Sequence, residues 1–320
     1  MGQVFYCTRE RNSMATSVIN NPLAKKRFFP SSFVDKYFLV FVSWPSMIIM
    51  LAVTAIPFLI TIVLSFTNYD LILEHWNFIG LTNFRELIKD PQLPKILWNT
   101  AYLVIGSTVL TTTFGLGLAV LMNSTFRGTR LVRTMYMLPI MTAPIVVAFT
   151  WRAMFNNNAG WINWILGLLH LPKPLWLGDP LLAMPAVLIS DMWTGVAFQA
   201  ILLLAGLMSV PSDLKQAATT DGANNWQVFW HVTLPHIRPV LFVAILLRLI
   251  EAFRKFEGIQ ILTTGGPGIS STPLNLAIYD TGLYYDRVGY AASMGVLLIV
   301  IIALSVVVLF RFSPKQDLGK

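Results

Sequence analysis

The sequence is poor in cysteine and in charged side chains. Cys7 is the one cysteine among 320 residues, so the chain cannot close a disulfide within itself or build a cysteine-rich metal site. Charged residues make up only 12% of the chain, whereas hydrophobic residues make up 55%. A soluble core does not need this much apolar surface, and the composition therefore indicates an integral membrane protein.

Signatures of common catalytic and metal sites are also missing. The sequence contains no phosphate loop of the GxxxxGK[ST] type, no HExxH pair and no GxSxG turn. The four histidines are scattered, and the five-residue spacing of His231 and His236 does not place both side chains on one helix face. We therefore expect the chain to have no catalytic site and no metal site of its own.

Six apolar segments are long enough to cross a bilayer, which takes about 20 mostly apolar residues per helix. They predict the fold class, an all-α integral membrane bundle of six transmembrane helices. Charged residues between positions 248 and 255 interrupt the fifth segment, and prolines inside the first, third and fourth predict kinks there. The segments are roughly 38–66, 101–123, 135–155, 182–209, 239–257 and 288–310.

The basic residues predict the orientation of these segments. The net charge of +8 comes without a basic stripe interleaved with aromatic residues, so it does not indicate nucleic-acid binding. Lys and Arg concentrate in cytoplasmic loops of membrane proteins. Here most of those near the segment ends lie on the side of the two chain ends. We therefore expect a cytoplasmic N-terminal segment over 1–37, a transmembrane domain over 38–310 and a cytoplasmic tail over 311–320.

Two further features bear on the membrane boundary. The first apolar segment begins near Phe38 and is too long for the apolar part of a cleaved signal peptide, so we expect an uncleaved first span. The connection between the third and fourth segments carries Trp161, Trp164 and Trp176. Tryptophan favours the boundary between lipid and water, so this connection predicts a short helix at the outer membrane surface. A plain buried connector fits the same residues equally well.

A distinctive loop, at about 211–238, joins the fourth and fifth segments on the predicted cytoplasmic side. It contains the stretch QAATTDGANNWQVFWHVTLP. We predict a helix over about 213–220, a sharp turn at Gly222, and a second helix with apolar side chains at intervals of three that ends at Pro235. Such a pair of helices either docks into a groove on another protein or packs as an ordinary hairpin beneath the bundle.

This stretch resembles the EAA loop of ABC importer permeases, whose pattern is roughly E-A-A, two residues, D-G-A, an aromatic residue and a final L-P. The departure is Gln216, where the family usually has Glu, so a hydrogen bond would replace a charge contact. The resemblance implies a coupling helix that sits in a cleft on an ATPase subunit. The residues it assigns to coupling are Gln216, Ala217, Ala218, Asp221, Gly222, Ala223, Phe229, Leu234 and Pro235.

Other stretches resemble the carbohydrate branch of these permeases, the maltose and glycerol-phosphate type. They are FIGLTNFRELIKDPQLPKILWNT, LLLAGLMSVPSDL and LTTGGPGISSTPL, and the resemblance covers about residues 38–310. It implies the type I ABC importer permease fold in a bacterial inner membrane. It also implies that the chain forms half of the pathway for a sugar or related carbohydrate in an ATP-driven, binding-protein-dependent importer.

The same resemblance implies the partners. They are a second permease subunit, two ATP-binding subunits at the cytoplasmic face and an extracytoplasmic sugar-binding protein. ATP would be bound by those partner subunits, and this chain would carry no cofactor.

Charged side chains at membrane depth usually face the bundle interior or a water-filled cavity. Arg248 and Glu251, three residues apart on one helix face, are expected to form a structural pair. The charged residues of the fourth and fifth segments could also simply neutralise one another inside a bundle that holds no water. The positions that resemble those lining the sugar site of maltose-type permeases are Asp191, Thr194, Gly195, Phe198, Glu251, Ala252 and Lys255.

Two other functions are alternatives to that of an importer subunit. A secondary transporter acting without an ATPase partner is the alternative, but it would more typically show internal symmetry and enough helices for two halves. A membrane-embedded enzyme is the third, and it would need acid, base or metal-binding side chains that converge. The mixed charges of the fifth segment suit ion pairing better than catalysis.

Overall fold

The computed structural model describes residues 31–70, 72, 76–124 and 128–313. The chain divides into two compact units, Met1–Phe58 and Leu59–Lys320, and the second holds nearly all of the helices. Most of the predicted N-terminal segment and tail lies outside the described residues.

The described residues are mostly helical, which confirms the predicted all-α class; an isolated bridge joins Thr67 to Phe78. Five helices are long and apolar enough to span a membrane, and a bent pair raises the number to six. The elements are α1 (Ser31–Leu64), α2 (Thr82–Lys89), α3 (Leu93–Asn123), α4 (Thr129–Met141), α5 (Pro144–Met154), α6 (Trp161–Leu168), α7 (Ala183–Met208), α8 (Ser212–Thr220), α9 (Asn225–Val228), η1 (Phe229–Thr233), α10 (Leu234–Arg254), α11 (Glu257–Leu262), α12 (Leu274–Tyr279), η2 (Asp280–Tyr284) and α13 (Val288–Phe310).

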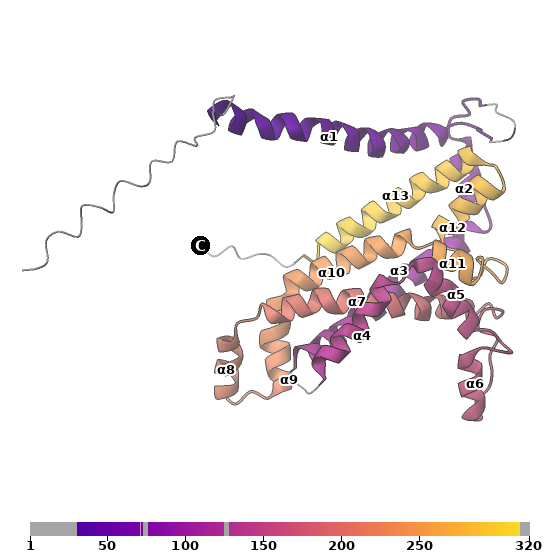
Figure 1. Ribbon diagram of the computed structural model, residues 1–320. Coiled ribbons are helices and arrows are strands. Elements are labelled where there is room, and N and C mark those ends of the chain that lie inside the picture. The colour runs from indigo at the N-terminus through magenta and orange to yellow at the C-terminus, as the bar shows by residue number, and fades with distance from the viewer. Residues whose placement is uncertain (1–30, 71, 73–75, 125–127, 314–320) are drawn as a thin grey trace, which may run out of the picture. The chain divides into compact units, whose positions relative to one another are not determined.

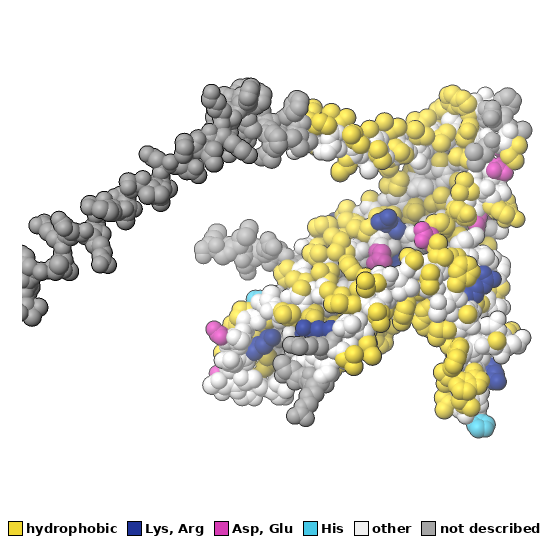
Figure 2. Space-filling model, viewed as in Figure 1, with side chains coloured by type: hydrophobic (Ala, Val, Ile, Leu, Met, Phe, Trp, Pro, Cys, Tyr) yellow, Lys and Arg dark blue, Asp and Glu magenta, His cyan; other side chains and the backbone are white. Residues whose placement is uncertain are grey.

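Three long helices form the centre of the unit Leu59–Lys320. α3 packs along α7, and α10 packs against both (Figure 1). At one end of these helices lie α2, α5, α11 and α12, and at the other end lies the α8–α9 hairpin. The face shown in Figure 2 is largely hydrophobic, as lipid-facing surfaces are. The core between the three helices includes Leu118, Ala119, Leu203, Leu207, Ile237 and Ala244.

Four of the six predicted spans correspond to single helices. The fourth and sixth agree with α7 and α13 to within one residue at each end. α3 begins eight residues before the second predicted span, because Pro94 is accommodated in its first turn, where a missing N–H costs nothing. α1 begins earlier than the first predicted span and continues through Pro45 and Pro57.

The third predicted span is a bent pair of helices, and the kink predicted from its prolines is confirmed. It is divided into α4 and α5, and the segments Arg133–Met141 and Pro144–Met154 are bent by 104°. The break lies at Thr142 and Ala143, whose ψ angles of 131° and 136° are both outside helical geometry. Pro144 explains its position, because a proline disfavours helical geometry in the residue before it and cannot donate to the preceding turn.

The fifth predicted span begins too late, and the loop helix does not end at Pro235. α9 continues through η1 into α10, so that one helical path runs over Asn225–Arg254. Pro235 has no N–H to donate to the carbonyl of His231, and Leu234 N donates to Phe229 O instead. The proline is thus absorbed by one wider turn of π-helix and does not stop the helix.

Candidate functional site

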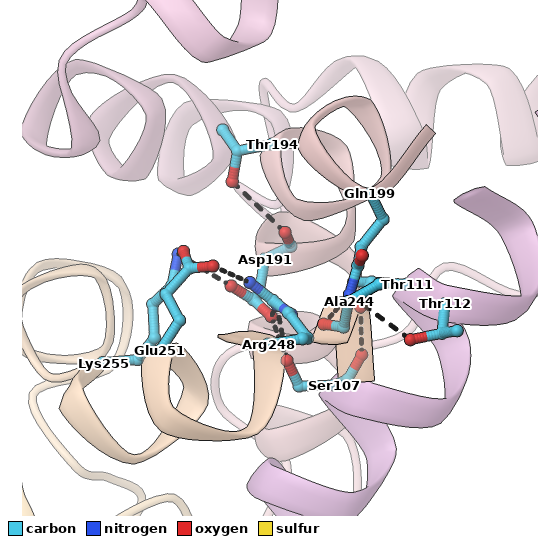
Figure 3. A network of polar contacts seen from close by, with 10 residues as sticks. All are labelled: Ser107, Thr111, Thr112, Asp191, Thr194, Gln199, Ala244, Arg248, Glu251 and Lys255. Carbon is cyan, nitrogen blue, oxygen red and sulfur yellow. Dashed lines mark hydrogen bonds and ion pairs between the residues drawn. The ribbon is translucent and has the colours of Figure 1, made fainter. Parts of the chain in front are cut away.

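Four charged side chains meet between α7 and α10 (Figure 3). Fully buried Arg248 donates from Nη2 to Oδ2 of Asp191, and its Nη1 lies 3.0 Å from Glu251 Oε2. Lys255 Nζ lies 3.0 Å from Asp191 Oδ1 and 3.2 Å from Glu251 Oε1. We call these four residues the charge network. Each of the two cations faces both carboxylates. The charge network as a whole therefore carries no net formal charge.

α3 contributes to the charge network through Ser107. The Ser107 hydroxyl donates to Asp191 Oδ2 at 2.6 Å and accepts a hydrogen bond from Arg248 Nη2. Gly195 on α7 provides the space, because a Cβ there would lie 2.9 Å from Cζ of Arg248 and 2.8 Å from Cγ2 of Thr111. A guanidinium that is cut off from water needs such close polar partners, since burying an unpaired charge is costly.

A second polar contact joins the same three helices two turns further along α7. Gln199 is fully buried and donates from Nε2 to the carbonyl of Ala244 at 3.0 Å and to Thr112 Oγ1 at 3.4 Å. α3, α7 and α10 are therefore joined at two levels, once by paired charges and once by an amide. Polar contacts of this kind fix how packed helices are aligned.

The members of the charge network differ in exposure. The side chains of Arg248 and Asp191 are 0% and 7% exposed, whereas those of Lys255 and Glu251 are 31% and 43% exposed. A charged group that faces acyl chains is costly, so we expect this half-exposed side to border water or another protein. It is the candidate lining of a solute pathway.

The structure brings four of the seven predicted substrate residues together. Thr194 lies beside them, and its hydroxyl donates to the backbone carbonyl of Asp191 at 3.2 Å. Phe198 is 43% exposed, whereas Ala252 is buried and packs in a cluster with Val104 and Phe253. The four that meet are Asp191, Gly195, Glu251 and Lys255.

The predicted pair of Arg248 and Glu251 is confirmed. Sequence reasoning missed that Arg248 also pairs with Asp191, and it missed Ser107 and Gln199 altogether. The available signal was polar residues inside otherwise apolar runs, since a buried polar group in a membrane helix has to find a partner.

Nothing in the described part of the chain resembles a metal site. No group of three or more His, Cys, Asp and Glu side chains there could hold a metal ion. The carboxylates of Asp191 and Glu251 both face cations, which suits ion pairing. The site therefore offers charged and polar side chains to a solute.

The predicted coupling loop forms a helical hairpin. α8 ends at Thr220, and Gly222 follows with a φ of +89°, a conformation that glycine adopts without a Cβ penalty. Ala223 N donates to Ala218 O at 3.0 Å, and Gly222 N donates to Thr219 O at 3.1 Å. These two bonds satisfy the last carbonyls of α8 in the manner of a Schellman motif. The predicted turn at Gly222 is confirmed.

A reciprocal cap, which sequence reasoning missed, begins the second arm of the hairpin. Gln227 N donates to Asn224 Oδ1 at 2.9 Å, and Asn224 N donates to Gln227 Oε1 at 2.8 Å. The signal is the N-x-x-Q spacing, which is a form of the capping box. The turn between α8 and α9 is therefore held on both sides.

The residues that the resemblance assigns to coupling are exposed or half-buried on the hairpin. No residue of α8 is buried, and none of the nine assigned residues is buried in this chain. Leu214, Trp226 and Trp230 are exposed apolar side chains on the same hairpin. An exposed apolar and small-residue surface at one end of the bundle is typical of a protein contact.

Substituting Gly195 by Ala is expected to destabilise the bundle by about 1–3 kcal/mol, because the added methyl group overlaps a packed, ion-paired guanidinium. Thermal unfolding of the purified complex measures the effect. Gly117→Ala is the matched control, since Gly117 lies on exposed α3 surface with nothing within 4 Å of an added Cβ. Equal stability of both variants would contradict close packing at Gly195.

Comparisons with known proteins agree with this architecture. The trehalose/maltose transport system permease protein MalF of Thermococcus litoralis is 36% identical over 217 residues, covering 67% of this chain and 71% of that protein. The probable ABC transporter permease protein YesP of Bacillus subtilis is 34% identical over 274 residues, covering 84% and 88%.

The fold is similar to that of a chain in the crystal structure of a bacterial alginate ABC transporter in complex with an alginate pentasaccharide-bound periplasmic protein. The TM-score is 0.78 at 24% identity, over 90% of this chain and 98% of that chain. The profile of binding-protein-dependent transport system inner membrane components matches residues 111–317. The chain therefore belongs to the family of binding-protein-dependent transport system inner membrane components and is a multi-pass permease subunit of such an importer.

Proposed function

We propose that the chain forms half of the translocation pathway for a sugar or related carbohydrate, powered by ATP-binding partner subunits. The carbohydrate class is supported by the relative that is named a trehalose/maltose permease. The position of the pathway is supported by the half-exposed pair of Glu251 and Lys255 within the charge network.

The exposed side of the charge network suits polyhydroxylated solutes. The Glu251 carboxylate accepts hydrogen bonds from hydroxyl groups, and the Lys255 ammonium donates to their oxygens. Phe198, exposed on α7, offers a ring face against which the apolar side of a sugar ring stacks. Arg248, with no exposed surface, holds these groups in place and does not itself touch the solute.

The α8–α9 hairpin is the proposed contact with a cytoplasmic ATP-binding subunit. The helical path Asn225–Arg254 runs unbroken from the hairpin to Arg248, and Arg248 is joined to α7 and α3. Closure of the ATPase pair would thus move the hairpin and α10 as one body, and the charge network would transmit this motion to its neighbours.

The remaining parts of the proposed assembly rest on the positions of the basic residues and on the family. Both chain termini lie on the cytoplasmic side with the hairpin, and an extracytoplasmic binding protein delivers solute at the opposite end, beside α2, α11 and α12. A second permease subunit completes the pathway. ATP is bound and hydrolysed on the partner subunits, so this chain catalyses no reaction and carries no cofactor.

The test is reconstitution of this chain with its second permease, ATP-binding subunits and binding protein in lipid vesicles. Uptake and ATP hydrolysis are measured across a panel of sugars loaded on the binding protein. We expect uptake that needs both ATP and the binding protein. Uptake by this chain alone without ATP would contradict the proposal and favour a secondary transporter.

Substituting Lys255 by Gln is expected to reduce sugar uptake several-fold while the complex still assembles, because a partly exposed positive charge is lost and the Gln amide makes only weaker, neutral hydrogen bonds. Uptake and sugar-stimulated ATP hydrolysis in reconstituted complexes measure the change. Arg254→Gln is the matched control, since Arg254 is an adjacent exposed cation outside the charge network. Unchanged uptake and selectivity in Lys255→Gln would assign Lys255 a purely structural role.

A further inference from the structure

The short helix α6 turns its apolar side away from the protein. Its outward side chains are spaced i, i+3, i+4 and i+7, which places them on one helix face. They are between 48% and 67% exposed. A helix that packs on its own protein directs such a stripe inward. The four residues are Trp161, Trp164, Ile165 and Leu168.

The inward side of α6 is held by a buried amide. Asn163 donates from Nδ2 to Pro174 O and to Asn157 Oδ1, both at 3.2 Å. Its Oδ1 accepts a hydrogen bond from Trp176 Nε1 at 2.9 Å, and the Trp176 ring lies 5.4 Å from that of Phe155. Since these contacts fix the rotation of α6, its apolar stripe is held outward by the fold.

The direction of α6 also differs from that of the long helices. α6 extends from the bundle at the end away from the α8–α9 hairpin and runs crosswise to α7 (Figure 1). Because α7 is apolar and long enough to cross the bilayer, a helix that runs crosswise at its end lies along the membrane surface. Hydrophobic side chains cover much of α6 (Figure 2).

We propose that α6 is an anchor in the lipid interface on the side of the membrane opposite the α8–α9 hairpin. The two indole rings sit at the level of the headgroups, where tryptophan is favoured, and Ile165 and Leu168 reach the upper acyl chains. The stripe contains no charged or hydrogen-bonding side chain apart from the indoles, which suits lipid more than a protein partner. The exposed apolar surface of the spans continues into it (Figure 2).

This anchor holds the connection between the bent pair α4–α5 and α7 at a fixed depth, and it does so whichever solute is carried. Exposed His170 and Lys173 follow the helix and lie where headgroup phosphates accept hydrogen bonds. The membrane-surface role of α6 is thus independent of the carbohydrate assignment.

The first test uses spin labels in the complete importer, reconstituted in phosphatidylethanolamine and phosphatidylglycerol vesicles. Cys7→Ser removes the native cysteine, and Leu168→Cys carries a nitroxide in the stripe. We expect high accessibility to oxygen and low accessibility to a water-soluble nickel chelate. A label at Asn158→Cys, in the exposed polar turn before α6, should show the reverse. High nickel accessibility at position 168 would mean water, and low accessibility to both reagents would mean a protein partner; either overturns the proposal.

The second test keeps the stripe apolar. In vesicles that contain phosphatidylcholine brominated near the headgroup, the quenched part of the tryptophan fluorescence should fall when Trp161 and Trp164 are both replaced by Phe. Trp226→Phe, on the α8–α9 hairpin, should not lower the quenched part of the fluorescence. Equal quenching in the double variant and in the unmodified complex would overturn the proposal.

Discussion

Arg248→Gln is expected to destabilise the folded permease by about 3–5 kcal/mol, because it removes one partner of a buried ion pair. The buried Asp191 carboxylate then keeps Lys255 alone as its cationic partner. Ser107 would also lose the hydrogen bond that it accepts from Arg248. The loss should appear as a lower unfolding temperature of the purified complex and as poor assembly with the second permease.

A double-mutant cycle separates the ion pair from simple loss of packing. Arg248→Gln with Asp191→Asn removes one positive and one negative charge, so the network stays neutral and the Glu251–Lys255 pair remains. We expect the double variant to recover much of the stability lost in the single variant. A double variant no more stable than Arg248→Gln would show that the charge balance is unimportant here.

Ala217→Arg is expected to abolish most ATP-driven uptake while leaving membrane insertion and stability unchanged. Ala217 is exposed on α8, and a long charged side chain there blocks close approach of a partner surface without disturbing the bundle. Co-purification of the ATP-binding subunit and uptake in vesicles measure the effect. We expect a loss of about tenfold or more, since each 1.4 kcal/mol of lost binding is tenfold in affinity.

Three further substitutions make this test specific. Ala217→Ser adds one hydroxyl and should retain uptake. Gly222→Asn should also retain uptake, because Asn tolerates the positive φ of this position. Gly222→Trp places a large ring on the exposed turn and should uncouple the complex. If Ala217→Arg or Gly222→Trp imports at the normal rate with the ATP-binding subunit attached, the hairpin is not the coupling contact.

Local chemistry made several parts of the fold predictable. Length and hydropathy located α7 and α13 to within one residue, because a bilayer demands a minimum apolar length that few other elements reach. The turn at Gly222 was equally visible, because few other residues adopt positive φ at the end of a helix. Asn224 and Gln227 carry the spacing of a capping box, which is a local signal of the same kind.

Prolines show how far such local signals extend. Pro144 marked a weak point in the third predicted span, but the sequence did not reveal that the two halves bend by 104°. Pro235 predicts a helix end, yet the helix passes through it by a π-turn. A proline removes one hydrogen bond in both cases, and the packing of neighbouring helices decides whether the chain bends, breaks or continues.

The sequence by itself determined that the chain is a membrane bundle, where α7 and α13 lie, and that Arg248 and Glu251 share a helix face. Only the tertiary structure decided that Asp191, 57 residues before Arg248, is its partner, and that Ser107 joins them from α3. It also decided that the apolar stripe of α6 points outward. The reason is the same for each, since spacing along a helix is local, whereas the rotation and alignment of packed helices depend on contacts distant in sequence.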